Sequence, residues 1–512
     1  LALSGKIQNL WCDAGSASFF MRPKMLSISK KTTEKWYEEF PKLLEYKRAI
    51  EGVQRYRPHT LSDEGEKLLA DLSPAMGTHS DIRSIFANAD LHFGKINDED
   101  RKKVELTEAT YVLRLMSEDR NVRRAAFRKL YETYDGFGNT LSSLMNACVK
   151  ERTTLAKVRK YKDSITASTF SDEVTPEIYN NLINTVSENF APLFKYYDIK
   201  REVLGLPNMH MYDVYTPLIS SCSKEYDFEE AVSEVLDTVK VFGDEYLNTL
   251  KNGIEKEKWV DVYPTKGKRG GAYSAGCYDT QPYILLNYTG KLDDVSTLAH
   301  EAGHSMHSYF SRKSNTPQES DYTIFVAEVA STVNELLFCH RKLRESKSNE
   351  EKLSIMNQLM ETYKGTLYRQ TMFAEFEREM HALCEAGETL TKELLCDVYY
   401  KIVKKYFGNH VVCDKEIALE WMRIPHFYSC FYVYKYATCI SAASSIVHKI
   451  ETEGEAYIGK YLDFLKCGGS KSPLDSLKVA GIDMTKPEVV RDAIADFAET
   501  VDAFEKLYNE TK

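Results

Sequence analysis

The chain has 512 residues, 43% of them hydrophobic and 12% aromatic, which is enough to build a large buried core. Its net charge is −9, and no basic patch indicates a nucleic-acid partner. No run of about 18 apolar residues predicts a membrane span. The eleven cysteines are scattered without C-x-x-C spacing, which is typical of reduced thiols. We therefore expect a cytoplasmic protein, whose oligomeric state the sequence leaves open.

Helical periodicity dominates the chain before residue 204. The stretch 32–57 is charged and amphipathic, and a second helix is predicted over 61–72 with Ser62 as its N-cap. Thr175 and Pro176 mark another helix start, because Pro suits the first helical position. The other helices predicted in this part cover 107–116, 121–134 with Asn121 as N-cap, and 140–161.

The middle of the chain carries the strand-like sequence. The residues 206–207 break the helical pattern, and 210–215 is predicted to be a short strand. Helices resume at Asp227, a predicted N-cap, and most remaining strand-like sequence lies in 254–292. Beyond it the chain is helical again, up to a final amphipathic helix after Pro487. We predict a mostly α fold with a small sheet.

The most informative motif is His-Glu-Ala-Gly-His at 300–304. On a helix, His300 and His304 lie on one face, one turn apart, where two imidazoles can hold one metal ion, usually zinc. Glu301 follows the first ligand, where a carboxylate can take a proton from an activated water. Only about 0.02 such motifs are expected by chance in this chain, so the motif indicates a zinc hydrolase.

A helix with a broad apolar face carries this motif. Asp293 and Asp294 are its predicted N-caps, since carboxylates favour the positive end of a helix. Gly303 lies between the two histidines and lowers the helix propensity. A small residue there leaves room for a close-packed neighbour or for the backbone of a substrate.

A catalytic zinc needs a third protein ligand, and Glu328 is the best candidate. It is embedded in an apolar helix, where a carboxylate is costly unless it is paired or bound to a cation. The competing candidate, His307, is rotated away from the two histidines and is predicted to pack or to lie behind a ligand. Three other side chains could orient a ligand imidazole, and the sequence does not distinguish between them: Ser331, Thr332 and Glu335.

Together these segments resemble peptidase family M3, and within it the oligoendopeptidase F branch. The resemblance runs from about residue 20 to the C-terminus. The matching text is GKRGGAYS at 267–274, YDTQPYILLNY at 278–288, TLAHEAGHSMH at 297–307, FVAEVAS at 325–331 and IPHFY at 424–428.

The resemblance implies a two-lobed helical metallopeptidase with a deep channel and a small sheet beside the zinc helix. It implies a helical N-terminal lobe over 1–170, with part of the family's N-terminus missing, and a catalytic domain over 171–512. It also implies one zinc ion per chain, held by His300, His304 and Glu328. The substrates would be short peptides, because the channel excludes folded proteins.

The segment 426–436 holds four tyrosines and one histidine in eleven residues, which is too polar for a plain apolar core. A phenol can donate a hydrogen bond to a developing oxyanion. By resemblance, Tyr434 matches the catalytic tyrosine, His426 the substrate-side histidine and Tyr428 a second substrate contact. Tyr432 and Tyr436 could instead be core packing.

The segment before the motif is the predicted substrate edge. Gly271 allows close approach of a backbone, and Tyr273 follows it. A short strand is predicted over 283–288, and a strand beside a metal site can pair with an extended peptide. The alternative is a purely structural hairpin.

These features predict a zinc metalloendopeptidase in which Glu301 is the general base and Tyr434, with His426, stabilises the oxyanion. Tyr428, Gly271 and Tyr273 are the predicted substrate contacts. Two alternatives belong to other classes: an inactive relative that only binds peptides, and a helical scaffold with an accidental motif.

Overall fold

The protein is mostly helical in the computed structural model, which describes residues 2–18, 20–219 and 224–512, and this confirms the predicted fold class. The helices before the sheet are α1 (Ala2–Ser18), α2 (Met21–Ser27), α3 (Lys30–Glu39), α4 (Lys47–Gln54), α5 (Asp63–Leu72), α6 (Thr78–Ile85), α7 (Glu108–Leu115), α8 (Arg120–Gly136), α9 (Gly138–Val158), α10 (Ser164–Ser171), α11 (Pro176–Ser187), α12 (Ala191–Val203), α13 (Phe228–Val239) and α14 (Asp244–Glu255). Those after it are α15 (Leu292–Ser314), α16 (Ile324–Glu345), α17 (Asn349–Tyr363), α18 (Arg369–Glu385), α19 (Lys392–Phe407), α20 (Tyr434–Glu453), α21 (Glu455–Leu465), α22 (Pro473–Val479) and α23 (Glu488–Thr511). No helix in these described parts is both long and apolar enough to cross a membrane.

Two small sheets accompany the helices. The three-stranded sheet has the order β3-β5-β4, from β3 (Val260–Asp261), β4 (Tyr273–Ala275) and β5 (Tyr283–Leu285), and it lies where strands were predicted. Strand β4 pairs antiparallel with β5 and forms one edge of this sheet. A second, antiparallel pair, β1 (Lys95–Asn97) and β2 (Lys103–Glu105), was not predicted.

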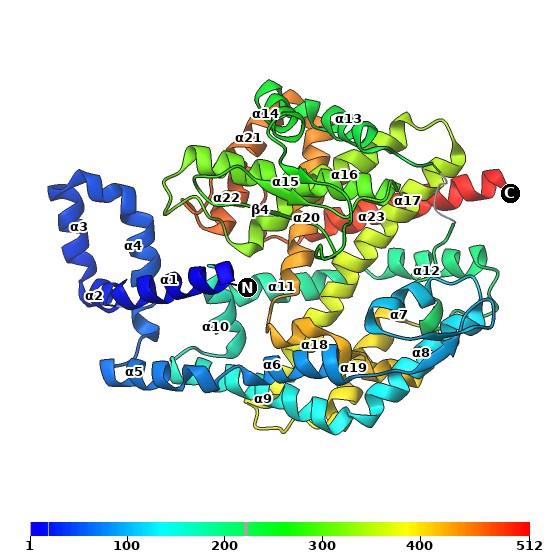
Figure 1. Cartoon of the computed structure of the whole chain (residues 1–512), viewed down its shortest axis with the longest axis horizontal. Coiled ribbons are helices and arrows are strands. Elements are labelled where there is room, and N and C mark those ends of the chain that lie inside the picture. Colours follow the sequence, from blue (N-terminus) through cyan, green and yellow to red (C-terminus); the bar gives the residue numbers. More distant parts are fainter. Residues whose placement is uncertain (1, 19, 220–223) are drawn as a thin grey trace.

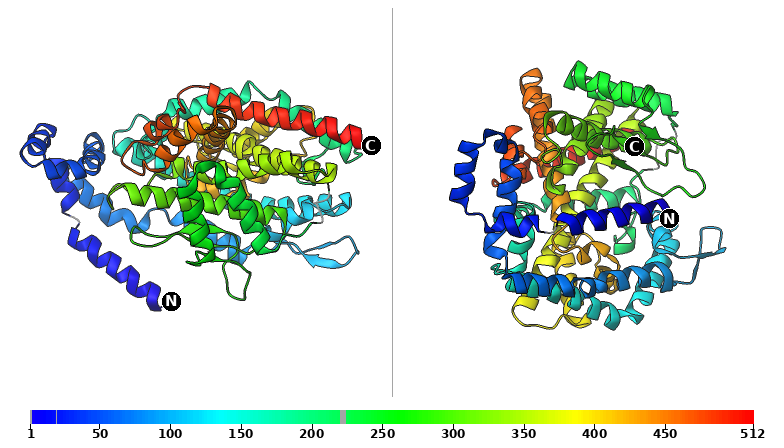
Figure 2. Two further views of the ribbon diagram at one scale, coloured as in Figure 1. Left: turned by 90° about the horizontal axis from the view of Figure 1, so that it is seen from above. Right: turned by 60° about the vertical axis from the view of Figure 1, so that its left-hand side comes forward.

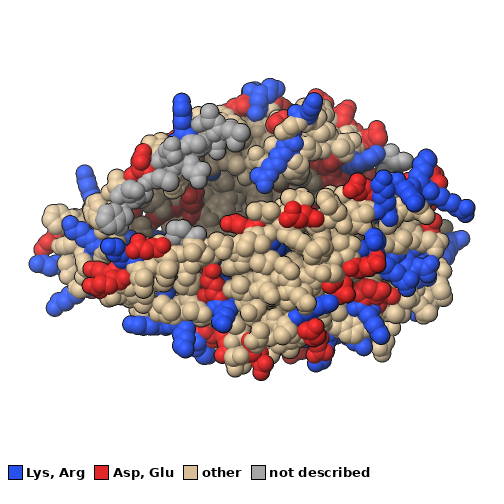
Figure 3. Space-filling view, turned by 60° about the horizontal axis from the view of Figure 1, so that its bottom comes forward, with Lys and Arg blue, Asp and Glu red and all other residues tan. Residues whose placement is uncertain are grey.

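The helices form two layers with a hollow between them. Figure 1 shows α13 to α16 in the upper layer and α6 to α9 with α18 and α19 in the lower layer. Helices α1 to α4 project from this body as an arm, which Figure 2 shows from two further directions. Figure 3 shows the deep hollow on one face of the molecule. The lower layer combines segments from both sides of residue 170, because α18 and α19 pack against α9.

Most predicted helices are present, and their caps explain where they begin. Ser62 caps α5 by accepting a hydrogen bond from the Gly65 backbone N–H, and Asp227 caps α13 in the same way. Thr175 precedes Pro176 at the start of α11, but its side chain makes no cap hydrogen bond. The amphipathic stretch 32–57 is split between α3 and α4, because Pro41 begins a separate 3-10 turn.

Three local predictions were wrong in detail. Asp119, rather than Asn121, caps α8, since its carboxylate accepts from the Asn121 backbone N–H at 2.8 Å. Helix α15 begins at Leu292, which places Asp293 and Asp294 in its first turn, where the Asp294 carboxylate accepts from the Lys291 backbone N–H at 3.0 Å. The segment 210–215 contains one isolated β-bridge and a 3-10 turn instead of a strand.

The centre of the upper layer is the contact between α15 and α16, and α16 packs in turn against α20. Gly303 lies in the first of these contacts. A Cβ atom at this position would lie 2.5 Å from the Ala330 carbonyl oxygen and 2.6 Å from the Ser331 Cα. The small residue therefore leaves room for a close-packed neighbour, the first of the two reasons considered for it.

Candidate active site

Helices α15 and α16 bring the three predicted metal ligands together. The Nε2 atoms of His300 and His304 each lie 3.2 Å from Glu328 Oε2. The ligand atoms of the three residues all lie within 4.8 Å of one another, and no other such group occurs among the residues that the structure describes. Two imidazole nitrogens and one carboxylate oxygen are a donor set that suits a catalytic divalent metal such as zinc. The residues therefore fit the group that the motif implies.

The charges around these residues favour a bound cation. Burial alone would lower the pKa of His300, but the carboxylates of Glu328 and Glu335 outweigh it and raise that pKa to about 10. Burial likewise opposes ionisation of Glu328, yet hydrogen bonds from the two imidazoles hold its pKa well below the ordinary value. The pocket between the helices thus stabilises positive charge, whether it is carried by protons or by a metal ion.

Further side chains on α16 hold the ligands in place. The Glu335 carboxylate lies 3.1 Å from His300 Nδ1, so it orients the imidazole. The Ser331 hydroxyl donates to Glu328 Oε2 at 3.1 Å. Of the three residues left open by the sequence, Glu335 is thus the partner of the imidazole and Ser331 is the partner of the carboxylate. Thr332 is buried without a recorded bond to either ligand.

His307 does not join the metal group. Its ring is buried and stacks on Tyr322, with ring centroids 3.7 Å apart. Burial lowers the pKa of His307 to about 3, so the ring is neutral. It packs behind the ligands, as expected from its rotation on the helix.

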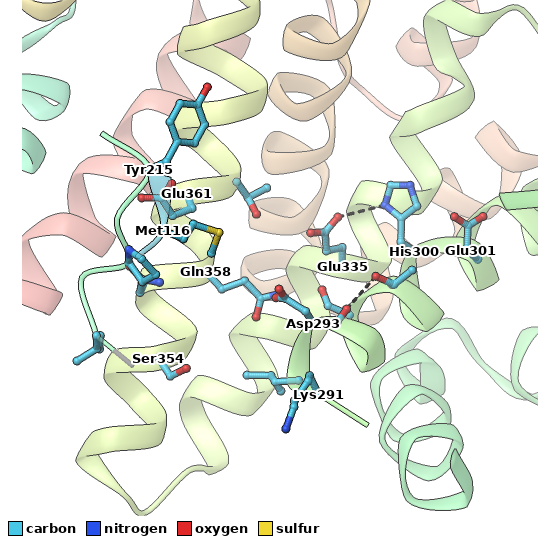
Figure 4. Close-up of a pocket in the computed structure, with 17 residues that line it drawn as sticks. Met116, Tyr215, Lys291, Asp293, His300, Glu301, Glu335, Ser354, Gln358 and Glu361 are labelled. Carbon is cyan, nitrogen blue, oxygen red and sulfur yellow. Dashed lines mark hydrogen bonds and ion pairs between the residues drawn. The ribbon is translucent and has the colours of Figure 1, made fainter. Parts of the chain in front are cut away.

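Glu301 lies beside His300 and is one of the residues that line a cavity (Figure 4). The side chain is only 5% exposed, and its Oε2 atom has no hydrogen-bond partner among the described residues. Burial raises the pKa of Glu301, while the neighbouring histidines and a backbone N–H of Ser274 favour the ionised form. A buried carboxylate with a free oxygen beside a metal site is suited to accept a proton.

The sheet lies directly against α15. The hydroxyls of Ser274 on β4 and Ser305 on α15 are 2.8 Å apart, which ties the edge strand to the helix one residue after His304. Tyr273, at the start of β4, is 44% exposed. Gly271 has a φ of +85°, which favours glycine, and its carbonyl accepts from the Asn287 side chain. Two of the three predicted substrate contacts, Gly271 and Tyr273, thus lie at the exposed edge of the sheet.

The aromatic segment divides into a buried part and an open part. Tyr434 is fully buried, and its ring packs against Tyr179 and Phe325, with centroids 4.9 and 6.1 Å away. Tyr436 is half-buried, and burial raises its pKa, with Tyr432 and then Glu328 adding to the effect. Tyr436 is therefore the more open of the two side chains, and the Glu328 carboxylate acts on its pKa.

His426 belongs with the open part. Its ring centroid lies 6.1 Å from those of both Tyr432 and Tyr436, and the two tyrosine rings are 5.5 Å apart. Burial lowers the pKa of His426, and the Arg83 guanidinium lowers it further. Tyr428 is 5% exposed and packs under Arg83. The structure groups His426 with Tyr432 and Tyr436, the two tyrosines for which core packing was the alternative interpretation.

A cavity of about 880 Å³ opens from the metal ligands between three helices (Figure 4). Residues of α15, including His300 and Glu301, form one wall together with Glu335 of α16. Residues of α17, from Ser354 to Thr362, form a second wall. The sequence did not identify this cavity, because its lining comes from segments more than 200 residues apart.

Comparison with known proteins identifies this architecture. A family model described as "Peptidase family M3" matches residues 113–496, and one described as "Oligopeptidase F" matches residues 24–93. The chain belongs to peptidase family M3. It is a metallo-oligopeptidase of the oligopeptidase F group, and the predicted resemblance is confirmed.

Individual relatives cover nearly the whole chain. Oligopeptidase PepF of Bacillus subtilis is 42% identical over 100% of this chain and 76% of its own length. The oligoendopeptidase F homolog of Borreliella burgdorferi is 41% identical over 97% of this chain and 83% of its own length. The crystal structure of oligoendopeptidase-F from Enterococcus faecium superposes with a TM-score of 0.82 at 33% identity, covering 99% of this chain and 87% of that one.

Proposed function

We propose that this M3 peptidase is a zinc-dependent endopeptidase that cleaves short oligopeptides. The supporting observation is that His300, His304 and Glu328 come together next to Glu301, which has a carboxylate oxygen without a partner among the described residues. His300 and Glu301 also line a cavity. One zinc ion per chain would be held by the two imidazoles and the carboxylate. When bound, it would act as a Lewis acid that polarises the peptide carbonyl and acidifies a water molecule.

Glu301 is the proposed general base. Its free Oε2 atom takes the proton of the attacking water and then delivers it to the leaving amine. The Ser274 backbone N–H, which favours the ionised carboxylate, keeps Glu301 ready to accept that proton. Burial excludes bulk water from the carboxylate and strengthens its interaction with the reacting groups.

The proposed oxyanion donors are Tyr436 and, beside it, Tyr432, with His426 as a substrate contact. We thus assign to Tyr436 the role that the sequence predicted for Tyr434, because Tyr434 is enclosed by Tyr179 and Phe325. The influence of Glu328 on the pKa of Tyr436 supports a position close to the metal ligands. A phenol there can donate a hydrogen bond to the negative oxygen that develops during attack.

The exposed edge of β4 is the proposed binding site for the peptide backbone. An extended peptide can add to this edge through main-chain hydrogen bonds, with Tyr273 and Gly271 beside it. The Ser274–Ser305 contact fixes the distance from this edge to the metal helix. Because main-chain bonds carry little sequence information, this edge would accept many peptides of suitable length.

Two further expectations remain part of this proposal. The cysteines whose side chains are described are free thiols, which suits the predicted cytoplasmic location. The division into an N-terminal lobe over 1–170 and a catalytic domain over 171–512 is also kept as a proposal.

Substitution of Glu301 by Gln tests the mechanism. The variant should keep its zinc content, measured by elemental mass spectrometry, and lose about 10²- to 10⁴-fold in cleavage of a quenched peptide. Near-normal cleavage would show that Glu301 is not the base.

Two further variants test the metal ligands. Zinc stoichiometry should fall in Glu328→Ala. It should not fall in His307→Gln, because the His307 ring packs on Tyr322.

The same assay decides between an active peptidase and an inactive relative that only binds peptides. An active enzyme cleaves the peptide, stops when a chelator removes the metal and recovers when zinc is returned. An inactive relative would bind the peptide without cleaving it under any of these conditions.

A further inference from the structure

The cavity beside the metal ligands has a strongly acidic wall. Asp293, Glu335 and Glu361 line it together with Glu301, and Lys291 is the one lysine or arginine among the described lining residues (Figure 4). Lys291 is already paired, since its Nζ lies 3.0 Å from Glu225 Oε1. Carboxylates therefore outnumber the cations available inside the cavity.

The carboxylates differ in how well they are neutralised. Glu361 is paired with Lys200 at 3.0 Å and also with Lys364. Glu335 uses one oxygen on His300. Asp293 is exposed and has no ion-pair partner among the described residues. It is thus the carboxylate of this wall that is free to pair with a cation of a ligand.

Unsatisfied acceptors elsewhere in the cavity point to a donor-rich ligand. Glu301, at 5% exposure, lines the cavity and has a buried Oε2 atom without a partner among the described residues. Asn357 Oδ1 on α17 is likewise buried and without a partner among the described residues. Buried acceptors of this kind are costly unless a ligand supplies hydrogen-bond donors.

Part of the cavity wall is apolar. It consists of Met116, Tyr215, Pro217 and Ile219, which lie outside the three helices of the site. A lysine or arginine side chain has a long apolar stem and a cationic head, and it gains most where an apolar wall faces a carboxylate. An α-ammonium group has no such stem, so the cavity fits a basic side chain better than a peptide terminus.

The distance from Asp293 to the metal ligands indicates where in the substrate the basic residue would lie relative to the cleaved bond. Asp293 precedes His300 by seven residues on α15, so it lies two helical turns from this ligand, or about 10 Å along the axis. Each residue of an extended peptide spans about 3.3 Å. Asp293 therefore lies about three residues of an extended peptide from the metal ligands, whereas the Glu335 carboxylate contacts His300 itself.

We propose that Asp293 forms a subsite for a lysine or arginine side chain of the substrate, about three residues to one side of the cleaved bond. The subsite rests on the proposed peptidase function and adds a substrate class to it: peptides with one basic residue at this distance. Asp293 carries the specificity, because Glu335 also serves His300.

A positional peptide series tests the subsite. Octapeptides with a quenched fluorophore would carry lysine, norleucine or glutamate at each of the positions two to four residues from the cleaved bond, on either side. Norleucine keeps the apolar stem of lysine without its charge. The expected wild-type result is a kcat/KM for lysine about tenfold above that for norleucine at one position only, with glutamate lowest.

Asp293→Asn should abolish this preference and leave cleavage of the norleucine peptide unchanged. Asp294→Asn is the matched control: it removes the same charge one residue away, where the carboxylate accepts from the Thr289 and Lys291 backbone N–H groups. This control should keep the lysine preference. Equal cleavage of lysine and norleucine peptides by the wild type, or an unchanged preference in Asp293→Asn, would overturn the subsite.

A binding measurement separates this proposal from the proposed catalysis. In the Glu301→Gln background, fluorescence anisotropy should show tighter binding of the lysine peptide than of the norleucine peptide, and Asp293→Asn should remove the difference. Binding without that difference would reject the subsite even if the enzyme is active. Absence of cleavage by the wild type, with the binding difference intact, would reject the peptidase mechanism and keep the subsite.

Discussion

The metal-ligand helices α15 and α16 lie next to the end of the aromatic segment 426–436, because α16 packs against α20, but the two regions are held by different kinds of contact. On the helix pair, hydrogen bonds fix His300, Glu328 and the edge strand, and Gly303 lets the two backbones touch. The ligand geometry is therefore decided within one pair of neighbouring helices.

The aromatic segment depends on the lower layer instead. Phe431 has a positive φ of 58°, and its backbone N–H donates to Glu377 of α18 at 2.8 Å. The Cys430 thiol lies 3.8 Å from that of Cys148 on α9. The positions of His426 and Tyr432 are therefore set by a layer that does not hold the metal ligands. Metal binding and oxyanion stabilisation should consequently respond to different substitutions.

Substitution of Tyr436 should have the largest effect that separates the two regions. Tyr436→Phe should lower kcat by about 10²- to 10³-fold with little change in zinc content, because it removes a donor to the oxyanion. Tyr434→Phe is the matched control two residues away and should keep kcat within a few-fold, since its hydroxyl has no partner among the described residues. Steady-state kinetics on one quenched peptide measures both. A larger loss in Tyr434→Phe than in Tyr436→Phe would return the role to Tyr434.

The next largest effect is expected for a substitution on the helix pair α15 and α16. Glu335→Gln should weaken zinc binding by about 10- to 100-fold, because the charged partner of His300 Nδ1 is lost. Competition with a chelator of known affinity measures this. Asp293→Asn removes a charge from the same cavity wall without touching a ligand, so its zinc affinity should stay near the wild-type value. Equal weakening in both variants would mean that the cavity charge, and not the hydrogen bond, supports the metal.

These two regions also differ in what the sequence could predict. His300, His304 and Glu328 could be found because helical spacing fixes the first two and an apolar helix singles out the third. Glu335 remained one of three candidates, because the choice depends on the rotation of α16 against α15. The mostly helical fold followed from periodicity in the same way, whereas the short pair β1–β2 has too few residues to show a pattern.

The choice between Tyr434 and Tyr436 could not be made from the sequence, for a physical reason. Helix α20 is buried on nearly all sides, so no polar face distinguishes Tyr434 from Tyr436. The family resemblance identified the segment 426–436, but it did not decide which of its tyrosines corresponds to the catalytic tyrosine. The acidic cavity could not be predicted from the sequence, because Asp293 and Glu361 come together only through tertiary packing.

The smallest expected effect tests how the lower layer holds the aromatic segment. Glu377 is fully buried, and burial raises its pKa well above the ordinary value of 4.5. A carboxyl group whose pKa is raised on folding stabilises the protein below its unfolded pKa and loses that contribution as pH rises towards the folded pKa. Glu377→Gln should therefore raise the melting temperature by roughly 1–3 °C at pH 8 and by less at pH 5.

The amide oxygen of Gln can still accept from Phe431 N–H, so the segment should keep its conformation and kcat should change little. Glu375, two residues earlier on α18, offers the contrast: its carboxylate is paired with Lys405 at 2.7 Å. Glu375→Gln should lower the melting temperature, because it leaves that ammonium group without its partner. A melting temperature for Glu377→Gln that falls at pH 8 would mean that Glu377 is ionised in the folded protein. The aromatic segment would then be held by a charged hydrogen bond, as the metal ligands are.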